Sequence, residues 1–141
     1  MLKEYGYKTE IPLKWYTAIC DIPNTIKCNY ADDVQFCILE NINVSLLISL
    51  LSCGNKDLFI RKELGHLFNP AKIKSISTYI SSGAKLVPPT ISYHAESNSL
   101  MIQDGRHRLR SAVISEQVKI PILISRNQFT PISILLMYQP K

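Results

Sequence analysis

The sequence predicts a small α+β domain in which helices pack against a small mixed β-sheet. From Asn69 onward, a helix, two strands joined by a turn, a second helix and a further strand follow one another, an order typical of α+β and α/β sheets. The 141 residues are 46% hydrophobic and 19% charged, which suits one domain with a single core. We therefore expect one domain over residues 1–141.

Three segments in the first half carry structural signals. Leu13–Ile22 is rich in aromatic and β-branched residues and stops at Pro23-Asn24, which predicts a strand ended by a turn. Val34–Leu39 predicts a second strand. Val44–Leu51 is apolar at nearly every position, so periodicity leaves it as either a buried helix or a core strand.

A helix is predicted to begin at Asn69. Asn69 is a candidate N-cap, and Pro70 occupies the first helical position, where its missing N–H costs nothing. Isoleucines then recur at helical spacing on one face, namely Ile73, Ile76 and Ile80. Gly83 is predicted to end this helix.

A hairpin and a second helix are predicted next. Residues 88–94 and 100–103 predict two strands joined by a turn at Ser97-Asn98. Apolar residues at helical spacing (Leu109, Ala112 and Val113) predict a helix over Arg106–Glu116. Ile120–Ile124 predicts another strand. Pro131–Tyr138 is a short apolar helix or strand that closes the core.

The cysteines and the N-terminal residues are typical of a cytoplasmic protein. The first twenty residues lack an apolar signal core, and the most apolar stretch is too short to span a bilayer, so we expect no membrane partner. No C-x-x-C pair and no zinc-type spacing with histidine occurs, so we expect free, mostly buried thiols. The four cysteines are Cys20, Cys28, Cys37 and Cys53.

Charge and local chemistry both point to an anionic partner. The net charge of +5 favours a polyanion such as a nucleotide or nucleic acid. At residues 104–110 a predicted strand passes through a glycine into a helix, whose N-terminus offers backbone N–H groups and the positive end of its dipole. Gly105 permits close approach of a phosphate. Cations at this helix end are unfavourable unless an anion binds there, and four follow the glycine: Arg106, His107, Arg108 and Arg110.

Alternatives to these site roles remain open. In the alternative interpretation, α-helical residues 106–116 lie on the surface and their arginines pair with Asp104, Glu96 or Glu116. Asp104 is either a metal ligand or general base beside the phosphates, or the N-cap of the following helix. Glu63, in the stretch RKELGH, is a second candidate acid or lies on a solvated helix face. Lys72, Lys74 and Arg110 are candidate contacts to a DNA backbone, although exposed lysines need no function.

The stretch LVPPTISYHAESNSLMIQDGRHRLRSAVISEQVKIPILI, residues 86–124, resembles the heart of the ParB/sulfiredoxin-like superfamily. In that superfamily a helix leads through G-x-x-x-P to a strand and a hairpin. A helix start of the type D-G-x-H-R or G-E-R-R follows, and then x-I-P-V on the next strand. The resemblance covers about residues 69–124, and YTAICDIPN loosely resembles the opening strand.

The resemblance implies a ParB/sulfiredoxin-like fold that holds a nucleoside triphosphate, ATP or CTP with Mg²⁺, at Gly105, Arg106, His107 and Arg108. Sulfiredoxins carry a cysteine directly before the His-Arg pair, whereas Arg106 stands here, so a sulfiredoxin-type reductase would lack its nucleophile. Chromosome-partition ParB proteins append a helix-turn-helix and a dimerisation domain, for which the 17 residues after Ile124 leave no room.

Small ParB-like proteins of plasmids and phages are therefore nearest in size. We expect a nucleoside-triphosphate-binding domain that acts as an NTPase and/or DNase on nucleic acid, in a mobile-element setting. The alternative is a catalytically inactive module that keeps the fold to dock on DNA or on a protein partner. A homodimer is also compatible with the sequence.

Overall fold

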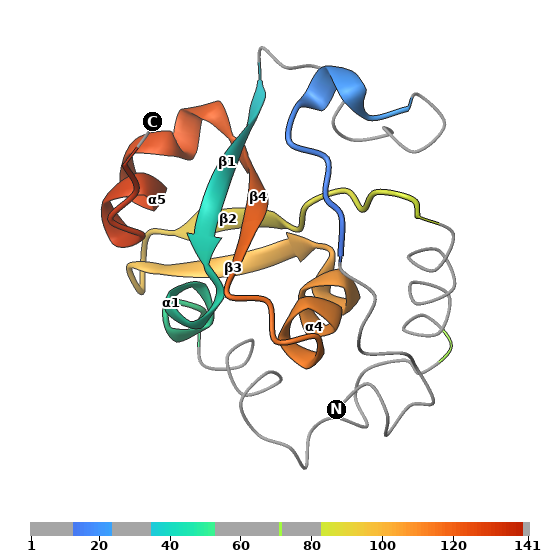
Figure 1. Cartoon of the computed structure of the whole chain (residues 1–141). Coiled ribbons are helices and arrows are strands. Elements are labelled where there is room, and N and C mark those ends of the chain that lie inside the picture. The colour runs from blue at the N-terminus through green and yellow to red at the C-terminus, as the bar shows by residue number, and fades with distance from the viewer. Residues whose placement is uncertain (1–12, 24–34, 53–70, 72–82, 140–141) are drawn as a thin grey trace.

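The computed structural model describes residues 13–23, 35–52, 71 and 83–139, which form a four-stranded mixed sheet with helices packed against it (Figure 1). The predicted α+β class with a mixed sheet is confirmed. The strands are β1 (Phe36–Asn43), β2 (Thr90–His94), β3 (Ser99–Asp104) and β4 (Lys119–Ser125). The helices are η2 (Ile19–Asp21), α1 (Val44–Ser49), α4 (Arg106–Ile114), η4 (Arg126–Gln128) and α5 (Phe129–Leu135).

The sheet has the order β1-β4-β2-β3. β1 and β4 are antiparallel, β2 and β3 form an antiparallel hairpin, and β2 runs parallel to β4 at Thr90 and Leu123. The central strand β4 is buried from Ile120 to Ile124, as expected for a strand covered on both faces. The predicted hairpin, its turn and the predicted strand at residues 120–124 are confirmed.

A bulge interrupts β1 where it passes Pro121 of β4. Leu39 pairs with Ile122 and Ile42 pairs with Ile120, so Glu40 and Asn41 together oppose Pro121. Proline inside a sheet is found at such irregularities because it cannot donate a ladder hydrogen bond. Asn41 takes a left-handed conformation (φ 61°), which asparagine adopts more readily than most residues. The bulge bends β1 before it enters α1.

The core lies on both faces of β4. On one face, alternate isoleucines of β4 pack with apolar residues of α1, α4 and α5, among them Leu47, Leu109 and Ile132, all fully buried. On the other face, Leu123 packs with Ile19, Ile22 and Val87. The residues before β1 thus cover the second face of the central strand.

Both apolar segments that the sequence left undecided are helical. Val44–Ser49 forms α1, whose N-cap Asn43 accepts a hydrogen bond from the backbone N–H of Leu46 (2.9 Å). Residues 129–135 form α5. In α1 the buried residues Val44, Leu47 and Ile48 form one helical stripe, whereas α5 buries Ile132 alone. Local periodicity does not contain this information, because both segments are apolar on most sides.

Helices α4 and α5 end in the same way, with a left-handed residue just past the helix. That residue is Glu116 after α4 (φ 58°) and Met137 after α5 (φ 50°), where glycine is the usual choice. The hydrogen bonds that form these endings run from Glu116 N–H to Val113 C=O, Gln117 N–H to Ala112 C=O, Met137 N–H to Ile134 C=O and Tyr138 N–H to Ser133 C=O.

The predicted strand over Leu13–Ile22 is wrong. Only Trp15 makes a bridge, to Leu86, and Ile19–Asp21 is a 3-10 helix. Its aromatic and branched side chains pack as a cover over the sheet, with Trp15 and Tyr16 half-buried, instead of lying in a strand of it. A segment rich in strand-forming residues is suited to a half-buried surface, but it need not form hydrogen-bonded β-strand pairs.

The predicted helix after Asn69 falls outside the described residues, apart from Ala71, which is helical, and Gly83. Gly83 has φ +82°, as a residue past a helix end often does. None of the helices in the described part of the chain is long and apolar enough to cross a membrane.

Candidate functional site

The turn between β3 and α4 is built by one glycine. β3 ends at Asp104, and Gly105 is the N-cap of α4 with φ 87° and ψ 23°, a left-handed conformation that favours glycine. The first helical hydrogen bond runs from Leu109 N–H to Gly105 C=O (2.9 Å). The predicted order of strand, Asp-Gly turn and helix is confirmed.

Gly105 is also needed for close packing. A methyl group at this position would lie 2.8 Å from Pro89 Cα and 2.8 Å from Arg108 Nη2, shorter than van der Waals contact. Pro89 comes directly before β2, so the backbone entering β2 and the α4 turn touch where only hydrogen fits. This contact between Pro89 and Gly105 therefore fixes the position of the α4 turn relative to the sheet.

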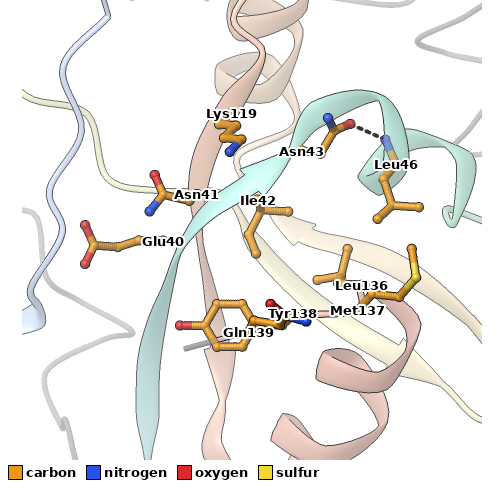
Figure 2. A pocket seen from close by; sticks show the side chains of 10 residues that line it. All are labelled: Glu40, Asn41, Ile42, Asn43, Leu46, Lys119, Leu136, Met137, Tyr138 and Gln139. Atoms are coloured by element: carbon orange, nitrogen blue, oxygen red, sulfur yellow. Dashed lines mark hydrogen bonds between the residues drawn. The ribbon is translucent and has the colours of Figure 1, made fainter. Parts of the chain in front are cut away.

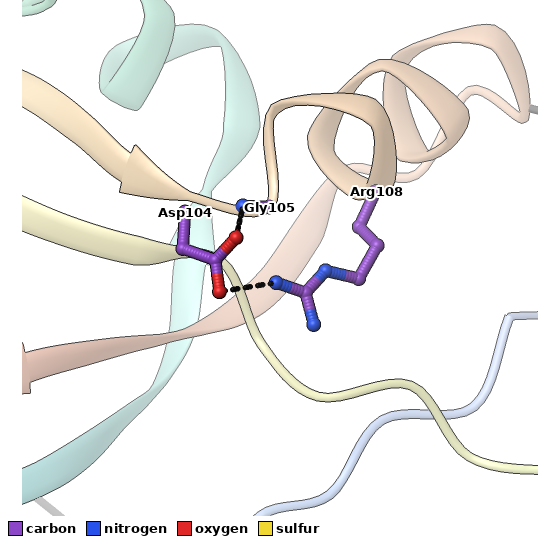
Figure 3. Close-up of polar contacts among 3 residues, drawn as sticks. All are labelled: Asp104, Gly105 and Arg108. Carbon is purple, nitrogen blue, oxygen red and sulfur yellow. Dashed lines mark hydrogen bonds and ion pairs between the residues drawn. The ribbon is translucent and has the colours of Figure 1, made fainter. Parts of the chain in front are cut away.

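Asp104 contacts both the turn and the helix (Figure 3). Its Oδ1 accepts a hydrogen bond from Gly105 N–H (2.9 Å), and its Oδ2 forms an ion pair with Arg108 Nη2 (3.4 Å). The interpretation of Asp104 as helix N-cap is wrong, because Gly105 occupies that position. The pairing of an arginine with Asp104, expected for an ordinary surface helix, is present.

The three arginines and the histidine of the turn differ in exposure. Arg106 is exposed, whereas His107 and Arg110 are half-buried. The Arg108 side chain is only 19% exposed, because it folds back over Gly105 toward Asp104, which is 54% exposed. Arg108 is therefore held close to both Gly105 and Asp104.

The first turn of α4 has a positive electrostatic character. It contains no acidic residue, and Gly105 has no side chain with which to cap it. By contrast, α1 is capped by the side chain of Asn43. A helix start with this composition attracts an anion through its dipole, its backbone N–H groups and charge-assisted bonds from arginine.

Three predicted site residues, Glu63, Lys72 and Lys74, lie outside the described residues. Lys85, another lysine near the turn in sequence, has its Nζ 5.9 Å from the centroid of the Tyr16 ring, a cation–π arrangement. Within the described ranges, no three side chains of His, Cys, Asp or Glu gather as a metal-binding group.

Sequence reasoning missed Pro89 and Thr90. Thr90 pairs with Asp104 across the β2–β3 ladder, and its buried Oγ1 has no hydrogen-bond partner among the described residues. Such a hydroxyl costs about 1–3 kcal/mol unless something binds it. The only signal in the sequence was the Pro-Pro pair before a strand. Such a pair predicts a rigid backbone entering the strand, but it does not predict which residues that backbone contacts.

Two of the cysteines can be placed. Cys20 is exposed, contrary to the expectation of mostly buried thiols, and Cys37 is half-buried; both are free. Burial raises the pKa of the Cys37 thiol, and the Arg126 guanidinium opposes this only in part. Cys37 is therefore protonated at neutral pH and a poor nucleophile. Cys28 and Cys53 lie outside the described residues.

The chain was also compared with known proteins. No protein-family model, no curated protein and no solved structure matches it. The function of the turn is therefore inferred from its geometry and from the chemistry of its residues.

Proposed function

We propose that the chain binds a nucleoside triphosphate, with the phosphates at the N-terminus of α4. The observation that carries this proposal is the placement of Arg108 against a left-handed glycine at a helix start without acidic residues. Without a bound anion, each positive side chain at this helix N-terminus destabilises the helix by tenths of a kcal/mol, because it lies at the positive end of the dipole. A bound phosphate reverses the sign of this effect.

The residues of the turn would divide the work of binding. Gly105 gives the turn its left-handed conformation, and Arg108 supplies charge-assisted hydrogen bonds in a direction set by Asp104. Arg106 and His107 add donors in the same turn. Mg²⁺ is commonly held by one or two carboxylates together with phosphate oxygens, and the exposed carboxylate of Asp104 fits that role.

The resemblance of residues 86–124 to the ParB/sulfiredoxin-like superfamily supports the same placement of a triphosphate, with ATP or CTP as the nucleotide. By this resemblance the chain would be an NTPase and/or DNase. From the residues themselves we assign Asp104 as metal ligand or general base and Glu63 as a second candidate acid. Lys72, Lys74 and Arg110 would contact nucleic acid.

A second candidate function is a binding module without catalysis. It is favoured by the state of Asp104, whose Oδ1 and Oδ2 both make contacts within the chain. A carboxylate that orients an arginine is a positioning group, and it is less available as a general base. In that case nucleotide binding would control docking on DNA or on a protein.

The test of binding uses calorimetry with each of the four NTPs and Mg²⁺. Arg108→Ala should weaken binding by about 1.5–3 kcal/mol, the cost of losing a hydrogen bond to a charged group. Arg126→Ala is the matched control, because it removes an exposed arginine in η4 outside the turn. No heat with any NTP at millimolar concentration, or equal losses in both variants, would refute the proposal.

A hydrolysis and plasmid-nicking assay then separates the two candidates. Asp104→Asn should bind nucleotide within a few-fold of wild type, and as a catalytic change it should lower turnover by about 10² or more. A wild-type chain that binds nucleotide and turns over neither substrate is the binding module. Full turnover by Asp104→Asn would show that the catalytic acid lies elsewhere.

A further inference from the structure

A cavity of about 560 Å³ lies between the bulge of β1, the start of α1 and the end of α5 (Figure 2). Its volume is in the range of ligand-binding sites. None of the residues 104–110 lines it, so it is separate from the α4 turn. Ile42 and Leu136, both buried, form part of its lining.

The two sides of the cavity differ in character. In Figure 2, Glu40 and Asn41 lie on one side of Ile42, and Leu46 and Met137 lie on the other. Gln139 adds a second amide to the lining. The lining is therefore mixed: Leu46, Leu136 and Met137 are apolar, Asn41 and Gln139 bring amide groups, and Glu40 and Lys119 bring charges of opposite sign.

Met137 is the unusual residue of this cavity. It has φ 50° at the position after α5 where glycine is favoured, so it carries left-handed strain, although its backbone N–H bonds to Ile134 C=O. Its side chain is 73% exposed, so it also gains little burial within the chain. Strain of this kind persists at sites that contact ligands, and methionine adapts well to varied apolar partners.

We propose that this cavity binds a bulky apolar side chain carried by an extended segment of a partner protein. The amides of Asn41 and Gln139 each offer a donor and an acceptor, as a peptide group requires. Leu46, Leu136 and Met137 offer the apolar contact for the side chain. An apolar group attached to a peptide backbone is the ligand that uses both walls.

The edge of the sheet supports an extended backbone as the occupant. β1 is an outer strand of the described sheet, and the Arg126 N–H to Gln35 C=O hydrogen bond (2.7 Å) fixes which residues face β4. By the alternation of an antiparallel ladder, Ile38 directs its N–H and C=O away from β4. A peptide strand added there would reach the cavity at the bulge.

A second copy of the chain is a poorer occupant of the same edge. The bulge at Glu40 and Asn41 breaks the regular ladder after Leu39, and bulges of this kind hinder pairing between identical edge strands. A short peptide follows the bend more easily than a twisted sheet edge does. We therefore assign the cavity to a heterologous peptide segment.

The experiment follows backbone amide and methionine methyl NMR signals during titration with the capped pentapeptide Ac-Thr-Thr-Phe-Thr-Thr-NH₂. Saturable shifts are expected at Ile38, Asn41, Met137 and Gln139. Replacing the central phenylalanine by alanine should weaken binding about tenfold or more, as expected for loss of one buried apolar side chain. A backbone N-methylated peptide should also bind more weakly, because it cannot complete the pairing with β1.

Two protein variants separate the Met137 side chain from its backbone. Met137→Gly should weaken the phenylalanine peptide about fivefold or more, since it removes one apolar wall while relieving strain. Glu116→Gly relieves the same backbone strain after α4, where no cavity residue is changed, and should bind as wild type does.

Three results would overturn the proposal. They are the absence of shifts at millimolar peptide, equal shifts with the phenylalanine and alanine peptides, and equal losses in Met137→Gly and Glu116→Gly. Shifts at Ile38 and Met137 that depend on protein concentration without peptide would overturn it too, in favour of a dimer through β1.

Discussion

The α4 turn and the β1–α5 cavity solve the same backbone problem in opposite ways. Both contain residues in the left-handed region: Gly105 at the turn, and Asn41 and Met137 at the cavity. At the turn the residue is glycine and neighbouring atoms crowd it from two directions. At the cavity the residues keep side chains, and that of Met137 extends into open space.

The difference separates two uses of an unusual conformation. Where another backbone segment or an anion must come close to the chain, a side chain would be in the way. Glycine leaves that space open and also adopts the left-handed conformation without strain. Where a side chain must be presented, a strained residue is kept although glycine would be more stable. At these two places the residue thus matches its surroundings: Gly105 stands where neighbouring atoms crowd the backbone, and Met137 stands where its side chain has room.

The largest effect is expected from Gly105→Ala. The change combines left-handed strain with overlap on Pro89 Cα, so the free energy of unfolding should fall by about 2–4 kcal/mol in urea denaturation. Gly83→Ala is the matched control: Gly83 has φ +82°, but no atom of the described residues lies within 4 Å of an added methyl group. Its loss should stay near 1 kcal/mol. Equal losses would mean that crowding at the turn is relieved by movement.

A smaller effect is expected from Asn43→Ala, which removes the N-cap of α1. The Leu46 N–H would lose its partner, at a cost of about 1 kcal/mol. The measurement is again urea denaturation, and Asn43→Asp, another good capping residue, should restore most of the loss. A loss within error of zero would show that α1 is held by its packing alone. The side-chain cap of α1, which α4 lacks, would then contribute nothing to stability.

The helix endings should respond in the opposite direction. Met137→Gly and Glu116→Gly should each raise the free energy of unfolding, by about 0.5–1 kcal/mol, because relief of left-handed strain exceeds the extra flexibility of the unfolded chain. Thermal melting of both variants would check this. Destabilisation of Met137→Gly alone would indicate that the Met137 side chain stabilises the isolated chain, contrary to its exposure.

The smallest effect is expected from Asp104→Asn. Asp104 is 54% exposed and its ion pair with Arg108 is solvated, so stability should change by less than about 0.5 kcal/mol. Melting curves at low and high salt would show whether even this difference is screened. A loss well above 1 kcal/mol would make Asp104 a structural residue of the turn instead of a positioning residue for an anion site.

The sequence contained most of the second half of this fold. The hairpin, α4 and β4 were predicted because their turns, caps and periodicity are local properties of residues 88–124. The Leu13–Ile22 segment was mispredicted because strand-forming composition does not distinguish a ladder from a covering layer. Val44–Ser49 and α5 stayed undecided, since their apolar runs take a helical form only against a defined sheet face.

The sequence predicted which residues form the α4 turn, but it did not predict how their side chains are placed relative to one another. The placement of Arg108 depends on Pro89, which reaches Gly105 only through the pairing of β2 with β3. The cavity could not be predicted at all, because it is assembled from short pieces of β1, α1, β4 and α5 that lie far apart in the sequence. Its one local sign, a methionine following a helix, has no meaning until the helix end is known.

The pairing of β1 with β4 also bears on how the chain folds. The β2–β3 hairpin joins neighbours in sequence, whereas Phe36 must find Ser125 across most of the chain. Closing so long a loop is entropically costly before any contact rewards it. We therefore expect the hairpin with α4 to form early and β1 to add late. The cavity beside the β1 bulge would then be the last part of the described structure to be completed.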